Sequence, residues 1–170
     1  MAIQLVGWGD MNKKSEDCQF PFKTEMAHVE DMFNVMKKLN GVSVAAPQIG
    51  IFKRFFIMNH TGRFDQTRLV VNPKILMHGK EQINSREGCL NLPGYFASVP
   101  RWAILEVEYW TLNESGKLVY ASARIKRFEA IVFQHAFEYL DGLNSVVKDF
   151  QKAQEILRQK SPVSVLSATN

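Results

Sequence analysis

Residues 127–142, RFEAIVFQHAFEYLDG, carry a strongly apolar helical pattern. Apolar side chains wrap most of the circumference of a helix over residues 127–140, so this helix is predicted to be buried on most sides. Asp141 and Gly142 predict its end, because Gly favours the backbone conformation that terminates helices. A helix buried in this way needs other elements packed around it, and the rest of the chain must supply them.

The segments before this helix are mostly strands. A first helix is predicted over residues 24–39, with Thr24 as its N-cap and Asn40-Gly41 as its end. The apolar face of this helix comprises Met26, Val29, Met32, Phe33, Met36 and Leu39. The predicted strands span residues 42–46, 55–58, 69–71, 103–112 and 117–125, and residues 113–116 form a hairpin loop between the last two.

The C-terminal part is predicted to hold an amphipathic helix over residues 148–160 and a Ser-rich, mobile tail over 161–170. The chain shows no repeat or long linker, so residues 1–170 are expected to form one domain. The order of helix, strands, buried helix and helix favours an α+β fold over regular βαβ units. We expect short antiparallel or mixed sheets around the buried helix, with helices at both ends.

The composition is that of an ordinary globular protein, with 46% hydrophobic and 22% charged residues and a net charge of +4. This scattered positive excess is too small to predict sequence-specific nucleic-acid binding. No apolar run approaches the roughly 20 residues that a membrane span requires, and residues 1–10 do not resemble a signal peptide. Two cysteines predict no secreted disulfide framework, so a reducing cytoplasm is the expected compartment.

Three segments carry candidate chemistry. Residues 41–48, GVSVAAPQ, combine small residues that let a backbone approach a ligand with the amide of Gln48. Residues 87–94, EGCLNLPG, place Cys89 in a turn-rich region, where it is a metal ligand, a nucleophile or a small buried hydrophobe. Residues 134–142, QHAFEYLDG, place His135 on the buried helix.

His135 stands where an H-E-x-x-H zinc motif would begin. In that motif two His at i and i+4 share one helix face and bind metal, and the Glu acts as general base. This chain has Ala136 at the Glu position and Tyr139 at the second His position. The bare motif therefore fails.

The three segments together resemble the peptide deformylase family in order and spacing. Leu92-Pro93-Gly94 after the Cys, Val99-Pro100-Arg101, and Leu140-Asp141-Gly142 support the resemblance, which covers about residues 41–149 and, more loosely, the first helix. The resemblance implies a peptide-deformylase-like fold and hydrolysis of the N-formyl group from the initial Met of new proteins. It also implies Fe²⁺, Zn²⁺, Ni²⁺ or a similar divalent ion held by one Cys and two His, with water in the open position.

The resemblance assigns roles to residues of this chain. Cys89 and His135 match two metal ligands, and Gln48 and the backbone N–H of Leu90 match the donors that stabilise the oxyanion. The remaining matches are substrate-binding residues, with a side-chain pocket formed by Val44, Phe128, Ile131 and Val132 and peptide contacts from Ser43, Gly94 and Arg101.

The departures predict impaired or absent catalysis. General-base catalysis contributes about 10²- to 10⁴-fold, and Ala136 has no proton acceptor. A phenol with a pKa near 10 must lose its proton to bind metal well, and the side chain of Tyr139 is longer than that of His, so weak or absent metal binding is expected. Ser43 replaces a Gly of the first segment, Asn91 replaces a Ser with a mild expected effect, and Glu138 replaces an Asp.

Two alternatives to an impaired deformylase stay open. The first is an active metallohydrolase that uses Cys89 and His135 with Tyr139 or Glu138, because Glu138 lies at i+3 from His135. The second is a non-catalytic peptide- or partner-binding protein. The candidate partners are formyl-Met peptides, nascent chains and the ribosome, with no membrane partner.

Overall fold

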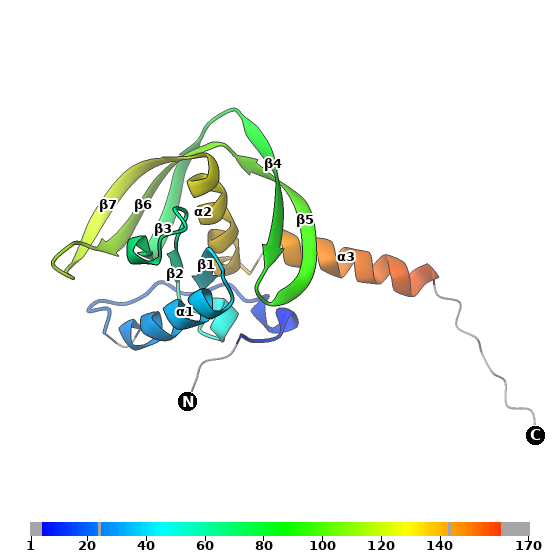
Figure 1. Ribbon diagram of the computed structural model, residues 1–170, viewed down its shortest axis with the longest axis horizontal. Helices are drawn as coiled ribbons and strands as arrows, with labels where there is room; N and C mark the ends of the chain where they lie inside the picture. Colours follow the sequence, from blue (N-terminus) through cyan, green and yellow to red (C-terminus); the bar gives the residue numbers. More distant parts are fainter. Residues whose placement is uncertain (1–4, 24, 143, 161–170) are drawn as a thin grey trace, which may run out of the picture.

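The computed structural model describes residues 5–23, 25–142 and 144–160. One antiparallel sheet of five strands has the order β1-β2-β3-β6-β7 (Figure 1). Its strands are β1 (Ser43–Ala45), β2 (Phe55–Met58), β3 (Arg68–His78), β6 (Ile104–Leu112) and β7 (Leu118–Lys126). Short 3₁₀ turns lie at Trp8–Met11, Ala46–Ile49 and Phe64–Gln66. The predicted α+β class is confirmed, since helices and antiparallel sheets make up the chain.

A second sheet consists of β4 (Gln82–Cys89) and β5 (Leu92–Trp102), which pair as a long hairpin. Helix α2 (Arg127–Leu140) contacts strands of both sheets and lies between them (Figure 1). Seven of its residues are buried, which confirms the prediction of a central helix. The hairpin was not predicted, because Gly, Pro and Asn in residues 87–94 indicated only turns.

Strand β3 runs to His78, although Asn72 and Pro73 led to a predicted end at Val71. The pairing with β6 shifts register between Val71 and Lys74, where Asn72 has a φ of 48°. The Asn72 side chain binds the backbone of Cys18 through both its oxygen and its nitrogen. This bulge accommodates Pro73, which has no N–H to donate, so the strand continues past a residue that usually ends one.

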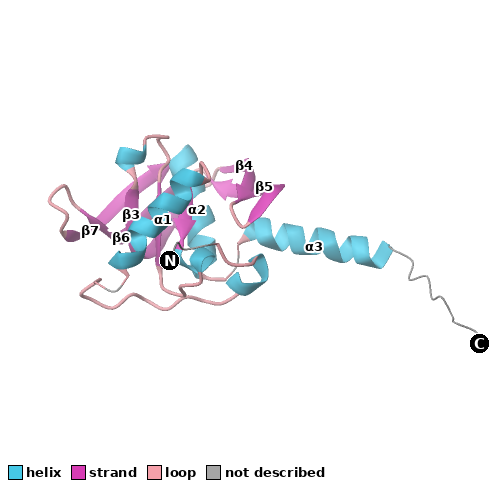
Figure 2. Cartoon of the chain, turned by 60° about the horizontal axis from the view of Figure 1, so that its bottom comes forward, coloured by secondary structure: helices cyan, strands magenta, loops and turns pink. Residues whose placement is uncertain are grey.

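Helix α1 (Met26–Lys38) covers one end of the large sheet (Figures 1 and 2). The predicted cap Thr24 lies outside the described residues. Met32 and Met36 are fully buried, as predicted for the apolar face. Met26 and Leu39 were wrongly assigned to that face, because they lie at the two ends of the helix and are 36% and 45% exposed.

Helix α3 (Ser145–Lys160) begins three residues before the predicted start. Asn144 caps it, with Oδ1 accepting the N–H groups of Val146 and Val147. The first part of α3 packs against β4 and β5, and the rest projects from the body (Figures 1 and 2). The predicted tail over 161–170 lies outside the described residues. Among the helices that are described, none has the length and hydrophobicity required to cross a membrane.

Candidate active site

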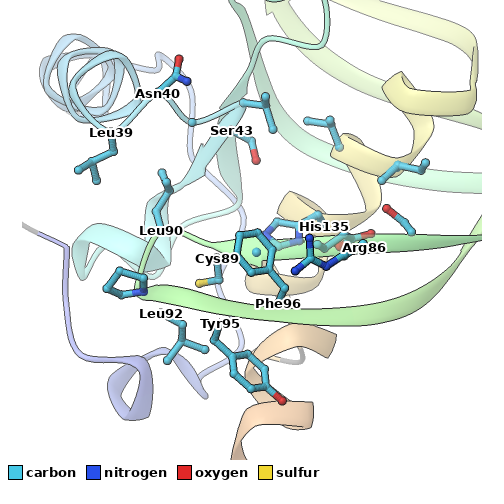
Figure 3. A pocket seen from close by; sticks show the side chains of 18 of the residues that line it. Leu39, Asn40, Ser43, Arg86, Cys89, Leu90, Leu92, Tyr95, Phe96 and His135 are labelled. Atoms are coloured by element: carbon cyan, nitrogen blue, oxygen red, sulfur yellow. Dashed lines mark hydrogen bonds and ion pairs between the residues drawn. The ribbon is translucent and has the colours of Figure 1, made fainter.

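A pocket of about 490 Å³ lies between β1, the β4–β5 hairpin and α2 (Figure 3). It brings together nine of the eleven predicted site residues, from all three sequence segments. Those nine residues are Ser43, Gln48, Cys89, Leu90, Gly94, Phe128, Ile131, Val132 and His135. Val44 does not line the pocket, because its side chain is fully buried in the core under α1, so its predicted role in the substrate pocket is not supported.

The tip of the hairpin fits closely against the chain before β1. A Cβ atom added to Gly41 would lie 2.8 Å from Cδ1 of Leu90, so Gly41 permits this close approach. Gly94, near the start of β5, has a φ of 81°, which favours Gly over other residues at this position. Ser43 lies in β1 and pairs with Met58 of β2. The φ of Ser43 is not positive, so Ser at this position brings no backbone strain.

The Cys89 thiol contacts a phenol. Sγ of Cys89 lies 2.6 Å from Oη of Tyr139, and the exposed fractions of the two residues are 7% and 1%. Burial raises the pKa of the Tyr139 hydroxyl well above its ordinary value of 10. Burial also raises the pKa of the Cys89 thiol, although hydrogen bonds from Tyr139 and the backbone of Asn91 and Leu92 oppose this shift. Thiol and phenol are therefore both protonated at neutral pH and form a closed hydrogen-bonded pair.

The position next to His135 carries no proton acceptor. Ala136 is fully buried among apolar side chains of the main core, which include Tyr139 and Leu140. The chain offers no general base at this point of α2.

His135 is oriented by a buried carboxylate. Its Nδ1 lies 2.9 Å from Oε2 of Glu87. Arg101 donates to the same carboxylate over 2.8 Å, from Nε to Oε1 and from Nη2 to Oε2. Burial opposes ionisation of Glu87, but the hydrogen bonds from Arg101 and His135 outweigh burial and lower its pKa to about 2. An ionised carboxylate only accepts, so Nδ1 of His135 carries the proton and Nε2 is the ring nitrogen left for the pocket.

Arg101 does not contact the pocket. Its side chain is almost fully buried, and it binds Glu138 as well as Glu87, with 2.6 Å between Nη1 and Oε1 of Glu138. Glu138 also accepts hydrogen bonds from the N–H and the hydroxyl of Ser145 at the start of α3. The predicted peptide contact of Arg101 is therefore not supported. The two carboxylates fix Arg101 inside the protein, and Arg101 and Ser145 in turn occupy the oxygens of Glu138.

Gln48 is held by Asn91, whose replacement of Ser was expected to have only a mild effect. Oε1 of Gln48 accepts the N–H of Ala45, and Nε2 donates to Oδ1 of Asn91 over 2.7 Å. Asn91 also donates to the carbonyl of Val6, over 2.8 Å. Asn91 thus connects the hairpin, Gln48 and the N-terminal segment. The sequence feature that could have indicated this role is Asn91 itself, whose side chain is longer than the Ser expected at this position.

Comparisons with known proteins identify the family. A family model described as polypeptide deformylase matches residues 2–153. A peptide deformylase of Pseudothermotoga lettingae is 33% identical over 141 residues, which is 83% of this chain and 78% of that protein. The structure of the Thermotoga maritima peptide deformylase superposes with a TM-score of 0.73 at 31% identity, covering 84% of this chain and 94% of the other. A Plasmodium falciparum peptide deformylase gives a TM-score of 0.75 at 26% identity, covering 92% and 96%. The chain therefore belongs to the peptide deformylase family.

The residues present do not fit the metal that this family implies. Cys89 and His135 supply two protein ligands, but the third position holds the hydroxyl of Tyr139, which is protonated and hydrogen-bonded to the Cys89 sulfur. Among the described residues, no three His, Cys, Asp or Glu side chains are grouped to hold an ion. Glu138, the alternative ligand, is directed to Arg101 and Ser145. Cys89 and Tyr139 form a hydrogen-bonded pair at the two positions where the metal would need two ligands.

Proposed function

We propose that this chain is a deformylase-fold protein that binds the blocked N-terminus of a peptide but does not hydrolyse it at deformylase rates. The observation that carries the proposal is the 2.6 Å contact between the Cys89 thiol and the Tyr139 hydroxyl. This contact uses the sulfur that would bind metal and fills the corner where a second imidazole would stand. Ala136, in place of the base, supports the same conclusion.

The pocket itself retains the features of a peptide site. Leu90, Leu92, Ile131 and Val132 give it an apolar lining, and Gln48 lies beside it. The amide nitrogen of Gln48 uses one hydrogen on Asn91 and has a second hydrogen to donate. An apolar side chain such as Met and a formyl or other carbonyl oxygen match these two parts of the pocket. Formylated nascent chains, presented at the ribosome, are the natural source of such ends, and the cytoplasm is the compartment in which they arise.

A turnover assay tests this proposal. The purified chain, supplied with Fe²⁺, Ni²⁺, Co²⁺ or Zn²⁺, is expected to release formate from a formyl-Met-Ala-Ser peptide at least about 100-fold more slowly than the Thermotoga maritima enzyme, because the base position is empty. The same preparation is expected to bind the peptide, as measured by calorimetry. Turnover within tenfold of that enzyme would rule the proposal out, and so would a complete lack of peptide binding.

The metallohydrolase alternative requires Tyr139 or Glu138 as third ligand. No contact in the described part of the chain favours it. Tyr139 stays protonated because it is buried, and Glu138 already holds Arg101 and Ser145.

A further inference from the structure

The mouth of the pocket carries a cation with no carboxylate partner. Arg86 is exposed on β4, and its guanidinium carbon lies 4.5 Å from the ring centroid of Phe96 on β5. Both residues line the pocket and lie next to each other in Figure 3. Within the described residues, no carboxylate oxygen lies within 4 Å of the Arg86 guanidinium. Arg86, which lines the pocket, therefore has N–H donors that no carboxylate occupies.

The local structure holds this guanidinium in place. Phe96 pairs with Gly88, and a Cβ added to Gly88 would lie 3.0 Å from Cε1 of Phe96, so the ring rests directly on the Gly88 backbone. Arg86 is two residues from Gly88 and lies on the same face of β4. The ring, although 53% exposed, is thus fixed by Gly88 below it and covered by Arg86. A cation–π contact of this kind keeps a guanidinium ordered without using its N–H groups.

The charge at the mouth is not neutralised from within the pocket. Glu87 is the one acidic residue of the pocket lining. Its side chain is 7% exposed and is already bound to Arg101 and His135. Arg86, on the opposite face of β4, receives no compensation from it. An exposed, ordered and uncompensated Arg favours an anionic group in the ligand.

We infer that the peptide bound in this pocket carries an acidic residue shortly after its blocked apolar N-terminus, and that Arg86 receives the carboxylate. This inference rests on the proposed function, since it assumes that the pocket binds a peptide end. The apolar lining from α2 holds the first side chain, and an extended peptide advances about 3.3 Å per residue. An acidic side chain at the second to fourth position is therefore within reach of the rim.

The test compares peptides that differ only in charge. Formyl-Met peptides with Asp at position 2, 3 or 4 are titrated against matched Asn peptides by fluorescence anisotropy, with the full chain in low salt. At one of these positions, Asp is expected to bind about threefold to tenfold more tightly than Asn, as for a charge-assisted contact at a partly exposed rim. The Arg86→Gln variant is expected to lower the affinity for the Asp peptide to that of its Asn counterpart. Salt at 0.5 M should reduce the difference in the natural chain.

Arg124→Gln is the matched control, because Arg124 is an exposed residue of β7 outside the pocket. It should keep the full preference for Asp. Equal affinities for Asp and Asn peptides at all three positions would overturn the inference while leaving the proposed function intact. A similar loss for both peptides in Arg86→Gln would also overturn it, because Arg86 would then act only on the shape of the hairpin. If no peptide binds, the inference and the proposed function are both wrong.

Discussion

Replacing Ala136 with Glu and Tyr139 with His in one chain is expected to yield a protein that binds one divalent transition-metal ion and releases formate from formyl-Met peptides. The gain over the natural chain should be at least about 100-fold, the lower end of what a positioned general base contributes. His at position 139 would stand at i+4 from His135, on the same helix face, and would remove the phenol that now holds the Cys89 thiol.

The stability of the double variant should also become metal-dependent. Ala136 is fully buried, so Glu at this position places a carboxylate in the core, and a bound ion with its water is the partner that compensates it. Metal at about 100 times its Kd would add about 2.7 kcal/mol to the free energy of unfolding. Thermal melts with and without chelator, on the same preparation as the formate assay, measure this effect.

The two single variants separate the parts of this prediction. Tyr139→His alone should bind metal but lack the base, and Ala136→Glu alone should lose stability and gain no activity. The gain of the double variant should therefore far exceed the product of the single gains, as expected for groups that act as a unit. A double variant that folds but binds no metal would show that the site is damaged beyond these two positions.

Replacing Arg101 with Met is expected to lower the free energy of unfolding by about 3–5 kcal/mol at pH 7, the range for removing one partner of a buried ion pair. Arg101 is 2% exposed and binds Glu87 and Glu138 together. Met keeps an apolar stem like that of Arg but lacks the guanidinium, so the loss reports mainly the stranded carboxylates. Urea unfolding measures it, with Arg124→Met as control. Because Arg124 is exposed on β7, its replacement should change stability by less than about 0.5 kcal/mol.

The pH dependence of this loss follows from Glu87. Its pKa is lowered in the folded chain from 4.5 to about 2, so its stabilising effect is fully present above pH 4.5 and disappears as the pH falls toward 2. As the pH falls from 4.5 to 2, the free energy of unfolding of the natural chain should therefore approach that of the Arg101→Met variant. A difference that stays constant from pH 7 to pH 2.5, or that is below about 1 kcal/mol at pH 7, would contradict the assigned network.

The central features of the fold and site were predicted in two different ways. The apolar pattern of residues 127–140 predicted the buried helix, because helical periodicity is visible in a single sequence. The common site of Gln48, Cys89 and His135 was implied by the resemblance of the three segments to the peptide deformylase family, and all three residues line one pocket.

Features that depend on long-range side-chain partners were missed or misassigned. Arg101 was expected to contact the peptide, and only the fold shows that two carboxylates bind it inside the protein. Cys89 and Tyr139 are likewise 50 positions apart in the sequence, so their contact, which keeps the thiol hydrogen-bonded, was not foreseen. The bulge at Asn72, which carries β3 past Pro73, depends on the distant backbone of Cys18.

Metal content of the protein as isolated, measured by plasma mass spectrometry together with a free-thiol count, tests the central claim most directly. We predict less than about 0.1 equivalent of Fe, Ni, Co or Zn per chain, even after incubation with excess ion and desalting, because two protein donors do not make the three-ligand catalytic site. One equivalent of metal retained per chain, with Cys89 protected from thiol reagents until a chelator removes that metal, would contradict the account.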